Sequence, residues 1–307
     1  MDKIAFVFPG QGSQIVGMGK DLYDNFDIAK DIYSSADEIT GIPLSAISFD
    51  GPAELLTQTH ITQPALYVHS YVLIRLIAEK INAVAAAGHS LGEYTANVYA
   101  KSFSFEDGLK LVKKRGELMR DSGLKRPGTM AALIGLTAEQ IDEICSTAKE
   151  NQIVQPANYN APGQIVISGD VDAVHRAMKI AKEEPYNCKL AKELQVSGAF
   201  HSELMLTSSE ELKVAIDKTE FHNSVIPIYT NAEAEPVEDK DIIKNSLFRQ
   251  LMSSVKWQML IENMISEHNI SKFYEIGSGK VLTGLIKRIN KEVEVFNIGS
   301  AEDIKKL

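Results

Sequence analysis

The sequence predicts an α/β fold: a three-layer large subdomain with a mainly parallel sheet, plus an inserted ferredoxin-like small subdomain. Short apolar runs alternate with helical patterns at both ends of the chain, which is typical of a parallel sheet covered by helices. A β-α-β-β-α-β order is predicted between these parts, and a Gly-x-Ser-x-Gly turn joins a strand to a helix. We expect residues 1–126 and 198–307 to form the large subdomain and residues 127–197 the small one.

Composition places the chain among ordinary globular proteins. It has 307 residues, of which 44% are hydrophobic and 24% charged, and a net charge of −9 that argues against a nucleic-acid binder. Cys145 and Cys188 form neither a disulfide framework nor a Cys-x-x-Cys metal motif. No apolar stretch reaches the roughly 20 residues that span a bilayer, and the N-terminal apolar run is too short for a signal peptide. We therefore expect a cytoplasmic protein with no membrane segment and no metal site.

The first strand, Ile4 to Phe8, is followed by a glycine-rich loop, Pro9 to Gln14. This loop lacks the spacing of a dinucleotide or phosphate-binding fingerprint. Its glycines would allow Gln11 to lean into a site and offer an amide N–H, although a plain turn with an exposed glutamine is the simpler explanation. Helical segments should follow; we expect them over residues 15–60, with breaks at 40–41 and 50–52, and over residues 64–80.

A second strand, Ala83 to Ala87, leads into Gly88-His89-Ser90-Leu91-Gly92 and then into a helix. This is the context of a nucleophile elbow, in which a strained turn holds the serine above the strand end. The N–H groups of the next helical turn point at the serine and are suited to stabilise an oxyanion. A serine that only caps the helix is the alternative. The strand before and the helix after the turn favour a nucleophile.

The next helix, expected from Phe105 to about Arg120, carries an arginine on its apolar side. Leu109, Val112 and Met119 repeat at helical spacing, and Arg115 fills the gap between them. A buried arginine needs an anionic partner, because an unpaired buried charge is costly. Either an Asp or Glu of the protein pairs with Arg115, or the guanidinium awaits a carboxylate ligand, which its planar fork binds at two points.

Turn residues at 121–123 and 126–128 predict the start of the small subdomain. Thr137 and Gln140 have the spacing of a capping box, which predicts the start of a helix. The expected elements are a strand at 129–135, a helix at 137–149, strands at 153–159 and 164–168, a helix at 172–182 and a strand at 190–196.

His201 is our choice for a general base. It follows small residues at the end of the last strand of the insert, where a side chain can project into a cleft, whereas the other late histidines lie in polar helical or loop settings. A bare histidine is more often structural, so this choice needs support. The remaining elements are predicted as a strand at 226–229, helices at 242–252 and 257–268, a strand at 273–276, a helix to 290 and a strand at 293–298.

Several stretches together resemble one family, the malonyl-CoA:acyl carrier protein transacylases, which have the acyltransferase fold of fatty-acid and polyketide synthesis. The resemblance covers essentially the whole chain. It rests on FPGQGSQ (8–14), TQPAL (62–66), GHSLGEY (88–94), VKKRGELM (112–119), GTMAALIG (128–135), NYNAPGQIVISG (158–169), GAFHS (198–202), RQL followed by Val255 and Trp257, and EIGSGKVLTGLIKRI (275–289). The family fold combines a hydrolase-like large subdomain with a ferredoxin-like small one, in agreement with the expectation above.

The resemblance implies a catalytic dyad. Ser90 looks like the acylated nucleophile and His201 like its base, with a backbone carbonyl near Gln250 orienting the imidazole in place of an aspartate. Gln11 and the Leu91 N–H resemble the oxyanion hole. The resemblance also implies substrate-binding residues, namely Arg115 as the clamp for the malonyl carboxylate, Phe200 for acyl-chain selectivity, and Met130, Asn160 and Val196 along the pocket.

The implied reaction transfers a malonyl group from malonyl-CoA, through a seryl ester, to the phosphopantetheine thiol of acyl carrier protein. No metal or redox cofactor is expected, and the partners are malonyl-CoA and acyl carrier protein, with no nucleic acid and no membrane. Carrier proteins of this kind are acidic, so basic residues near the site are candidate docking charges; these are Lys189, Lys192, Lys287, Arg288 and Lys291.

Two other functions use the same features. A serine acylhydrolase or thioesterase would share the elbow but would have no use for a cleft arginine, and an idle carrier-binding scaffold would not need the full set of site residues. Two departures from the family pattern, Lys101-Ser102 and Ser278, bear on local geometry only.

Overall fold

Two sheets organise the computed structural model, which describes residues 3–307. The larger sheet has six strands in the order β10-β9-β1-β2-β7-β8. All of its neighbours run parallel except β7 and β8. The bounds of these strands are β1 Lys3–Phe8, β2 Ala85–Gly88, β7 Ile228–Tyr229, β8 Pro236–Val237, β9 Ile270–Ile276 and β10 Glu294–Ile298.

Helices cover both faces of this sheet, as alternation along β1 requires. Phe6 and Phe8 pack into one apolar core, whereas Ala5 and Val7 pack into another on the opposite face, which contains Trp257. The first core is built with α1 Lys20–Asn25, α2 Asp27–Thr40, α3 Leu44–Asp50, α4 Ala53–Leu56, α5 Thr59–Ile77, α6 Gly92–Tyr99, α7 Phe105–Lys125, η1 Glu203–Met205, α10 Leu206–Lys218, α11 Lys240–Gln250 and α14 Ala301–Lys305; the second with α12 Trp257–His268 and α13 Val281–Ile289.

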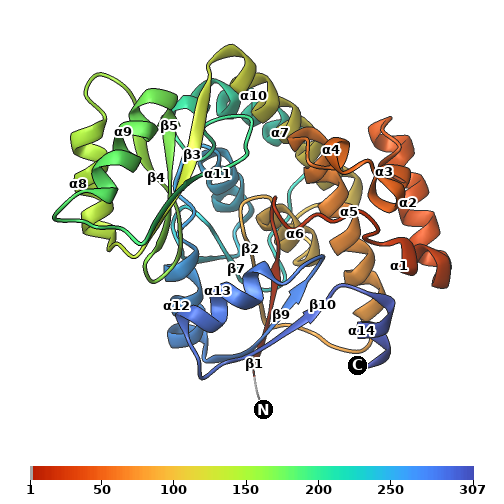
Figure 1. Ribbon diagram of the computed structural model, residues 1–307. Helices are drawn as coiled ribbons and strands as arrows, with labels where there is room; N and C mark the ends of the chain where they lie inside the picture. The colour runs from red at the N-terminus through yellow and green to blue at the C-terminus, as the bar shows by residue number, and fades with distance from the viewer. Residues whose placement is uncertain (1–2) are drawn as a thin grey trace.

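The smaller sheet is antiparallel, with the strand order β4-β5-β3-β6. Numbered within this unit the order is 2-3-1-4, and with its two helices it forms the predicted β-α-β-β-α-β pattern. The helices cover the outer face of the sheet (Figure 1), and the other face packs on the first core through Met130 and Val166. The bounds are β3 Gly128–Ile134, α8 Ala138–Ala148, β4 Val154–Ala161, β5 Gln164–Asp170, α9 Val171–Lys182 and β6 Leu190–Glu193.

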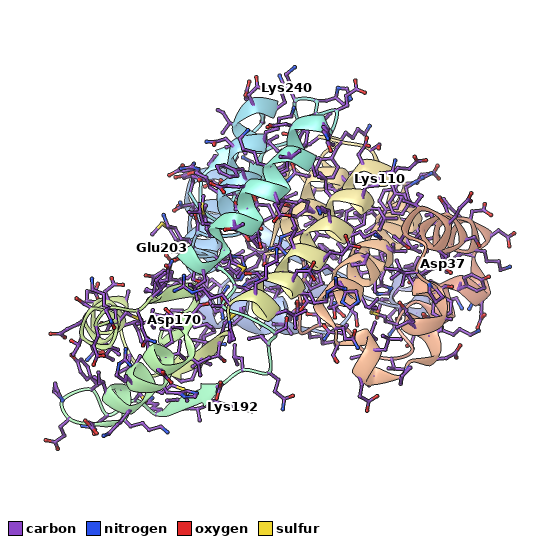
Figure 2. The ribbon with its side chains drawn as sticks, turned by 90° about the horizontal axis from the view of Figure 1, so that it is seen from above. Asp37, Lys110, Asp170, Lys192, Glu203 and Lys240 are labelled. Atoms are coloured by element: carbon purple, nitrogen blue, oxygen red, sulfur yellow. The ribbon has the colours of Figure 1, made fainter. Side chains whose placement is uncertain are left out.

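Seen from above, α7, which carries Lys110, lies between the small subdomain and the N-terminal helices (Figure 2). The small subdomain, marked by Asp170 and Lys192, forms one end of the molecule, and the helices around Asp37 form the other (Figure 2). The predicted fold class is confirmed. The division of the chain at 126 and 198 stays a prediction, and residues 1 and 2 of its first segment lie outside the described residues.

Two glycines allow the close packing at the turn after β2. A Cβ atom on Gly88 would overlap the backbone of Gly92, and one on Gly92 would overlap the carbonyl of Phe8. Strand β1, the turn and helix α6 therefore approach more closely than side chains would permit. This approach fixes the position of Ser90 relative to the carboxyl end of β1.

The structure corrects several sequence-based boundaries. Helix α7 continues through the predicted turn at 121–123, because Gly123 lies against the backbone of Ser197, a tertiary contact that favours glycine inside this helix. His201 is not at a strand end, since β6 already ends at Glu193. The loop between 232 and 241 contains β8, and α14 was not predicted. Lys101 has φ +62°, a left-handed conformation that explains why glycine is common there in the resembling family.

Candidate active site

Ser90 lies at the sharp turn between β2 and α6, with φ +52°. Its Oγ is 2.8 Å from Nε2 of His201 and 2.9 Å from Nη2 of Arg115. Because the guanidinium only donates, the serine hydroxyl accepts from Arg115 and directs its own proton to the imidazole. The structure thus brings together three residues that are far apart in the sequence, in the geometry of a nucleophile beside a base.

The imidazole of His201 is buried and its second nitrogen is also held. Nδ1 lies 3.0 Å from the carbonyl oxygen of Gln250 and 3.1 Å from that of Ser253. Two carbonyl acceptors require a hydrogen on Nδ1, which leaves the lone pair of Nε2 facing Ser90. Burial, followed by the nearby charge of Arg115, lowers the pKa of His201 to about 3, so the ring is neutral and ready to accept a proton at neutral pH.

Arg115 is 1% exposed and is held by neutral groups. Nη1 donates to Oε1 of Gln63 at 2.8 Å, and Nη2 donates to Oε1 of Gln250 at 3.0 Å. The guanidinium carbon lies 5.6 Å from the ring centroid of Tyr94. Within residues 3–307 the side chain makes no ion pair with a carboxylate, so the alternative of an internal salt bridge is wrong. Burial lowers the pKa of the guanidinium, which reflects this shortage of counter-charge.

A cavity of about 130 Å³ opens above Ser90. Five predicted residues line it besides the dyad and Arg115, namely Gln11, Leu91, Met130, Val196 and Phe200. The side-chain amide of Gln11 donates to Oγ1 of Thr59 at 3.2 Å. Leu91 directly follows Ser90, which is the position whose backbone N–H contributes to the oxyanion hole in a nucleophile elbow.

Asn160 is a correction, because it does not line this cavity. Its Oδ1 lies 2.8 Å from Nε2 of His89, so its amide is committed to that ring and meets the cavity only through it. Asn158, on the same strand, lines the cavity in place of Asn160. The register between β4 and β5 is irregular near both asparagines. Simple alternation along β4 could not distinguish the two asparagines.

Sequence reasoning missed a buried polar network behind Ser90. Asn231 accepts the Ser90 N–H through Oδ1 at 2.7 Å, and Gln250 donates from Nε2 to the Ser90 carbonyl at 2.9 Å. Both also donate to Oε2 of Glu93 at 2.9 Å. Glu93 belongs to the GHSLGEY stretch, which marked the region, but nothing local in the sequence indicated that Asn231 would reach it.

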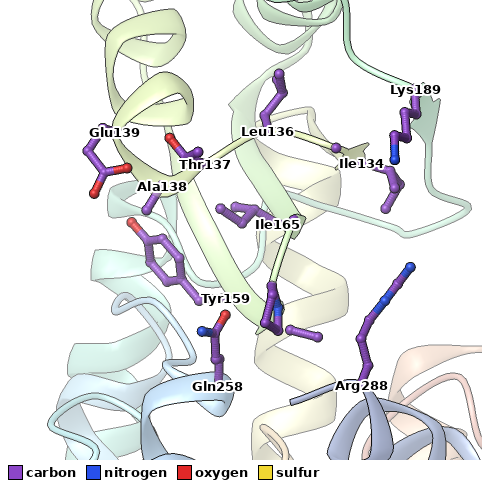
Figure 3. A pocket seen from close by; sticks show the side chains of 14 residues that line it. Ile134, Leu136, Thr137, Ala138, Glu139, Tyr159, Ile165, Lys189, Gln258 and Arg288 are labelled. Atoms are coloured by element: carbon purple, nitrogen blue, oxygen red, sulfur yellow. The ribbon is translucent and has the colours of Figure 1, made fainter. Parts of the chain in front are cut away.

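A second cavity, of about 480 Å³, lies where the small subdomain meets α12 and α13. Lys189 and Arg288 stand on one side of it and Glu139 on the other (Figure 3). Arg288 donates from Nη1 to Oε1 of Gln164 at 2.8 Å, which ties α13 to the small subdomain. Two of the five candidate docking charges therefore face one hollow.

Neither a metal cluster nor a membrane-spanning helix occurs among residues 3–307. No three His, Cys, Asp or Glu side chains are placed to hold a metal ion. No helix in this part of the chain has the length and apolar character needed to cross a membrane.

Comparison with known proteins gives relatives along nearly the whole chain. Residues 5–305 match the acyl transferase domain family. The malonyl CoA-acyl carrier protein transacylase of Bacillus subtilis is 42% identical over 99% of this chain and 96% of its own length, and that of Staphylococcus aureus is 40% identical over 99% and 98%.

Solved structures agree with these relatives. An acyl carrier protein S-malonyltransferase from Vibrio cholerae superposes with a TM-score of 0.94 at 40% identity, covering 99% of both chains. A malonyl-transacylase solved in complex with its type II polyketide synthase acyl carrier protein also gives 0.94, at 36% identity over 99% of this chain and 98% of its own.

Proposed function

Because this chain belongs to the acyl transferase domain family, we propose that Ser90 and His201 are the groups through which it transfers a malonyl group from malonyl-CoA to acyl carrier protein. The activity is that of an acyltransferase of fatty-acid or polyketide synthesis. One observation carries the assignment of the residues: Ser90 Oγ lies between the lone pair of a neutral imidazole and a buried guanidinium that pairs with no carboxylate of residues 3–307.

In the first half-reaction the Ser90 oxygen attacks the thioester carbonyl while its proton passes to Nε2 of His201. The resulting oxyanion is held by the Leu91 N–H and by Gln11, as in other acyl-transfer sites. When the tetrahedral intermediate collapses, the C–S bond breaks and the imidazolium returns the proton to the departing coenzyme A thiolate. The products are a malonyl-seryl ester and free coenzyme A.

Arg115 would bind the far end of the malonyl group. In the empty site Ser90 Oγ is one of its acceptors, and Gln63 and Gln250 hold the guanidinium in place. Acylation converts that hydroxyl into an ester and brings a carboxylate into the same small cavity. The carboxylate is then the stronger acceptor and supplies the missing counter-charge. A neutral acyl chain gains nothing from this guanidinium, which argues against an acylhydrolase of neutral chains.

In the second half-reaction the phosphopantetheine thiol of acyl carrier protein takes the place of coenzyme A. Neutral His201 accepts the thiol proton as the sulfur attacks the ester, and the proton returns to Ser90 Oγ as the C–O bond breaks. These steps use only side chains, backbone N–H groups and the two thiol substrates, so we propose that no cofactor takes part. We also propose a cytoplasmic location; Cys145 and Cys188 are both free thiols.

We place the carrier protein beside the second cavity. Lys189 and Arg288 face this hollow from the small subdomain and from α13. Of the other candidates, Lys192 lies on β6, Lys287 on α13 and Lys291 just after α13. An acidic helix would meet clustered positive charge there despite the net charge of −9.

Intact mass spectrometry tests the assignment. Malonyl-CoA should add one malonyl group to the wild-type protein, and holo acyl carrier protein should then remove it. Ser90→Ala should show no addition, whereas Ser104→Ala, at the exposed N-cap of α7, should be labelled like the wild type. A malonylated peptide that excludes Ser90 would contradict the assignment.

A further inference from the structure

Glu93 is a buried carboxyl that the proposed reaction does not use. It lies in the first turn of α6, three residues after Ser90, and is 1% exposed. Its Oε2 accepts two hydrogen bonds, from the backbone N–H of Asn231 and from Nε2 of Gln250, both at 2.9 Å. Buried carboxyls are costly, so one retained beside a nucleophile calls for a reason.

Both donors to Glu93 also hold the backbone of the nucleophile. Asn231 accepts the Ser90 N–H, and its Nδ2 donates to the carbonyl of Gly88 at 2.7 Å. Gln250 donates to the Ser90 carbonyl from the same amide nitrogen that reaches Glu93. The strained turn at Ser90 is therefore clamped at its N–H and at its C=O by residues that share one carboxylate oxygen.

Gln250 extends this control to the other two groups of the site. Its backbone carbonyl accepts from Nδ1 of His201, and its Oε1 accepts from Nη2 of Arg115. Its amide therefore has one correct orientation, with the NH₂ group towards Glu93 and the oxygen towards the guanidinium. A flipped amide would set two donors against Arg115 and an oxygen against Glu93, which the carboxylate forbids.

We propose that Glu93 is a positioning residue of the acyl transfer: its carboxylate fixes Gln250 and Asn231, and through them Ser90, His201 and Arg115. It does not touch substrate. The Gln250 amide links it to Arg115, on which its charge also acts, so it stabilises the guanidinium without occupying it, as a direct salt bridge would.

The charge state of Glu93 supplies a measurable consequence. Burial raises the pKa of Glu93 to about 7, and the negative charge of Glu233, in the turn after β7, contributes to this rise. The hydrogen bonds from Gln250 and Asn231 and the positive charge of Arg115 on α7 oppose the rise. Tyr94 is the neighbouring titratable residue on α6. A protonated carboxyl accepts hydrogen bonds more weakly than a carboxylate. The clamp should therefore loosen as the pH falls through about 7.

The raised pKa of Glu93 also allows a positioning role of this residue to be distinguished from a role in folding stability. A carboxyl whose pKa is higher in the folded than in the unfolded chain stabilises the fold at pH values below its unfolded pKa of 4.5. This contribution to the free energy of unfolding is lost as the pH rises through 7. Ionised Glu93 thus opposes folding at pH 8. Glu93→Gln, which keeps the shape and removes the charge, should melt at pH 8 no lower than the wild type while its acylation slows.

The test measures the single-turnover rate of Ser90 acylation by malonyl-N-acetylcysteamine, a short thioester without the phosphate that titrates near pH 6 in coenzyme A. For Glu93→Gln at pH 8 we expect the maximal acylation rate to fall roughly ten- to a hundredfold, the weight of one charge-assisted hydrogen bond, with little change in the thioester concentration that gives half of this rate. The wild-type rate should fall below pH 7, and this limb should be absent from the variant.

Glu275→Gln is the matched control, because Glu275 is equally buried and caps the N-terminus of α13 through Leu282 and Thr283. Burial also raises the pKa of Glu275, so this variant removes a comparable buried charge, but it should keep both the rate and the pH limb. Glu93→Gln with a wild-type rate and an unchanged pH profile would overturn the inference. If that variant does not fold, a wild-type profile that stays flat between pH 5.5 and 8.5 would overturn it instead.

The inference rests on the proposed acyl transfer, but the two fail separately. Absence of any malonyl ester on wild-type Ser90 would refute the proposed function. Normal acylation of both the wild type and Glu93→Gln would leave that function intact and refute only the role of Glu93.

Discussion

Replacing Arg115 with alanine should change which acyl group the protein accepts. The guanidinium is 1% exposed, and water cannot compensate a carboxylate that loses it. Truncating one partner of a buried charge pair costs about 2–5 kcal/mol, which corresponds to a roughly 30- to 5,000-fold loss in kcat/KM. We expect a loss near the middle of this range for malonyl-CoA.

Acetyl-CoA provides the comparison, since acetyl has no carboxylate. It loses only the bond from Arg115 to Ser90 Oγ, so its kcat/KM should fall about tenfold, the lower end for a charge-assisted hydrogen bond. The oxygens of Gln63 and Gln250 lose a donor, at about 1–3 kcal/mol each, but removal of the poorly compensated charge offsets part of that cost. The melting temperature should fall by about 2–4 °C for each kcal/mol that remains.

The assay is kcat/KM for malonyl-CoA and acetyl-CoA, measured on the wild type, Arg115→Ala and Arg115→Lys. The lysine variant should recover part of the malonyl activity, because an ammonium restores the charge without the planar fork. Arg120→Ala, which removes an exposed arginine of the same helix paired with Asp121, is the control and should keep the selectivity. An equal loss for both substrates in Arg115→Ala would refute the carboxylate clamp.

Two further predictions concern the base and the partner. The pKa of His201 is lowered to about 3, so His201 should not titrate between pH 5 and 8. In Glu93→Gln, which lacks the titrating carboxyl, the acylation rate should therefore be constant over this range. A fall in rate centred at pH 6.5, the ordinary pKa of histidine, would show that His201 is not held neutral. Arg288→Glu should raise KM for acyl carrier protein and leave kcat for malonyl-CoA acylation unchanged, whereas Lys213→Glu, on the exposed face of α10, should do neither. An unaltered KM in Arg288→Glu would move the docking surface elsewhere.

The fold could be predicted where local pattern decides structure. Short apolar runs located the central strands, the Thr137 and Gln140 capping box is present, and α12 has the predicted bounds. The errors occur where tertiary contacts override local preference. Asp121 to Gly123 carry turn residues, yet α7 continues because the glycine packs on the chain at Ser197. A two-residue strand such as β8 has too little pattern to be recognised.

The candidate site likewise contains some residues that the local sequence identifies and others that only the tertiary structure brings into place. Ser90 stands out because its turn, strand and helix are contiguous, and Arg115 because it interrupts an apolar stripe. Asn231 and the side chain of Gln250 act on Ser90 across more than a hundred residues of sequence, and only the folded chain brings them together. The position of the imidazole could not be predicted locally either, because His201 lies in a turn, with φ +57°, and not at the end of a strand.

The residues that line the proposed acyl pocket come from different layers of the molecule. Ser90 and Arg115 are fixed by the parallel sheet and its helices, whereas Met130, Leu194 and Val196 reach the cavity from the antiparallel insert and the segment leaving it. The proposed reacting groups and part of the cavity wall therefore belong to different parts of the fold. We expect substitutions at these three positions to change the size of the cavity without replacing either side chain that contacts Ser90 Oγ.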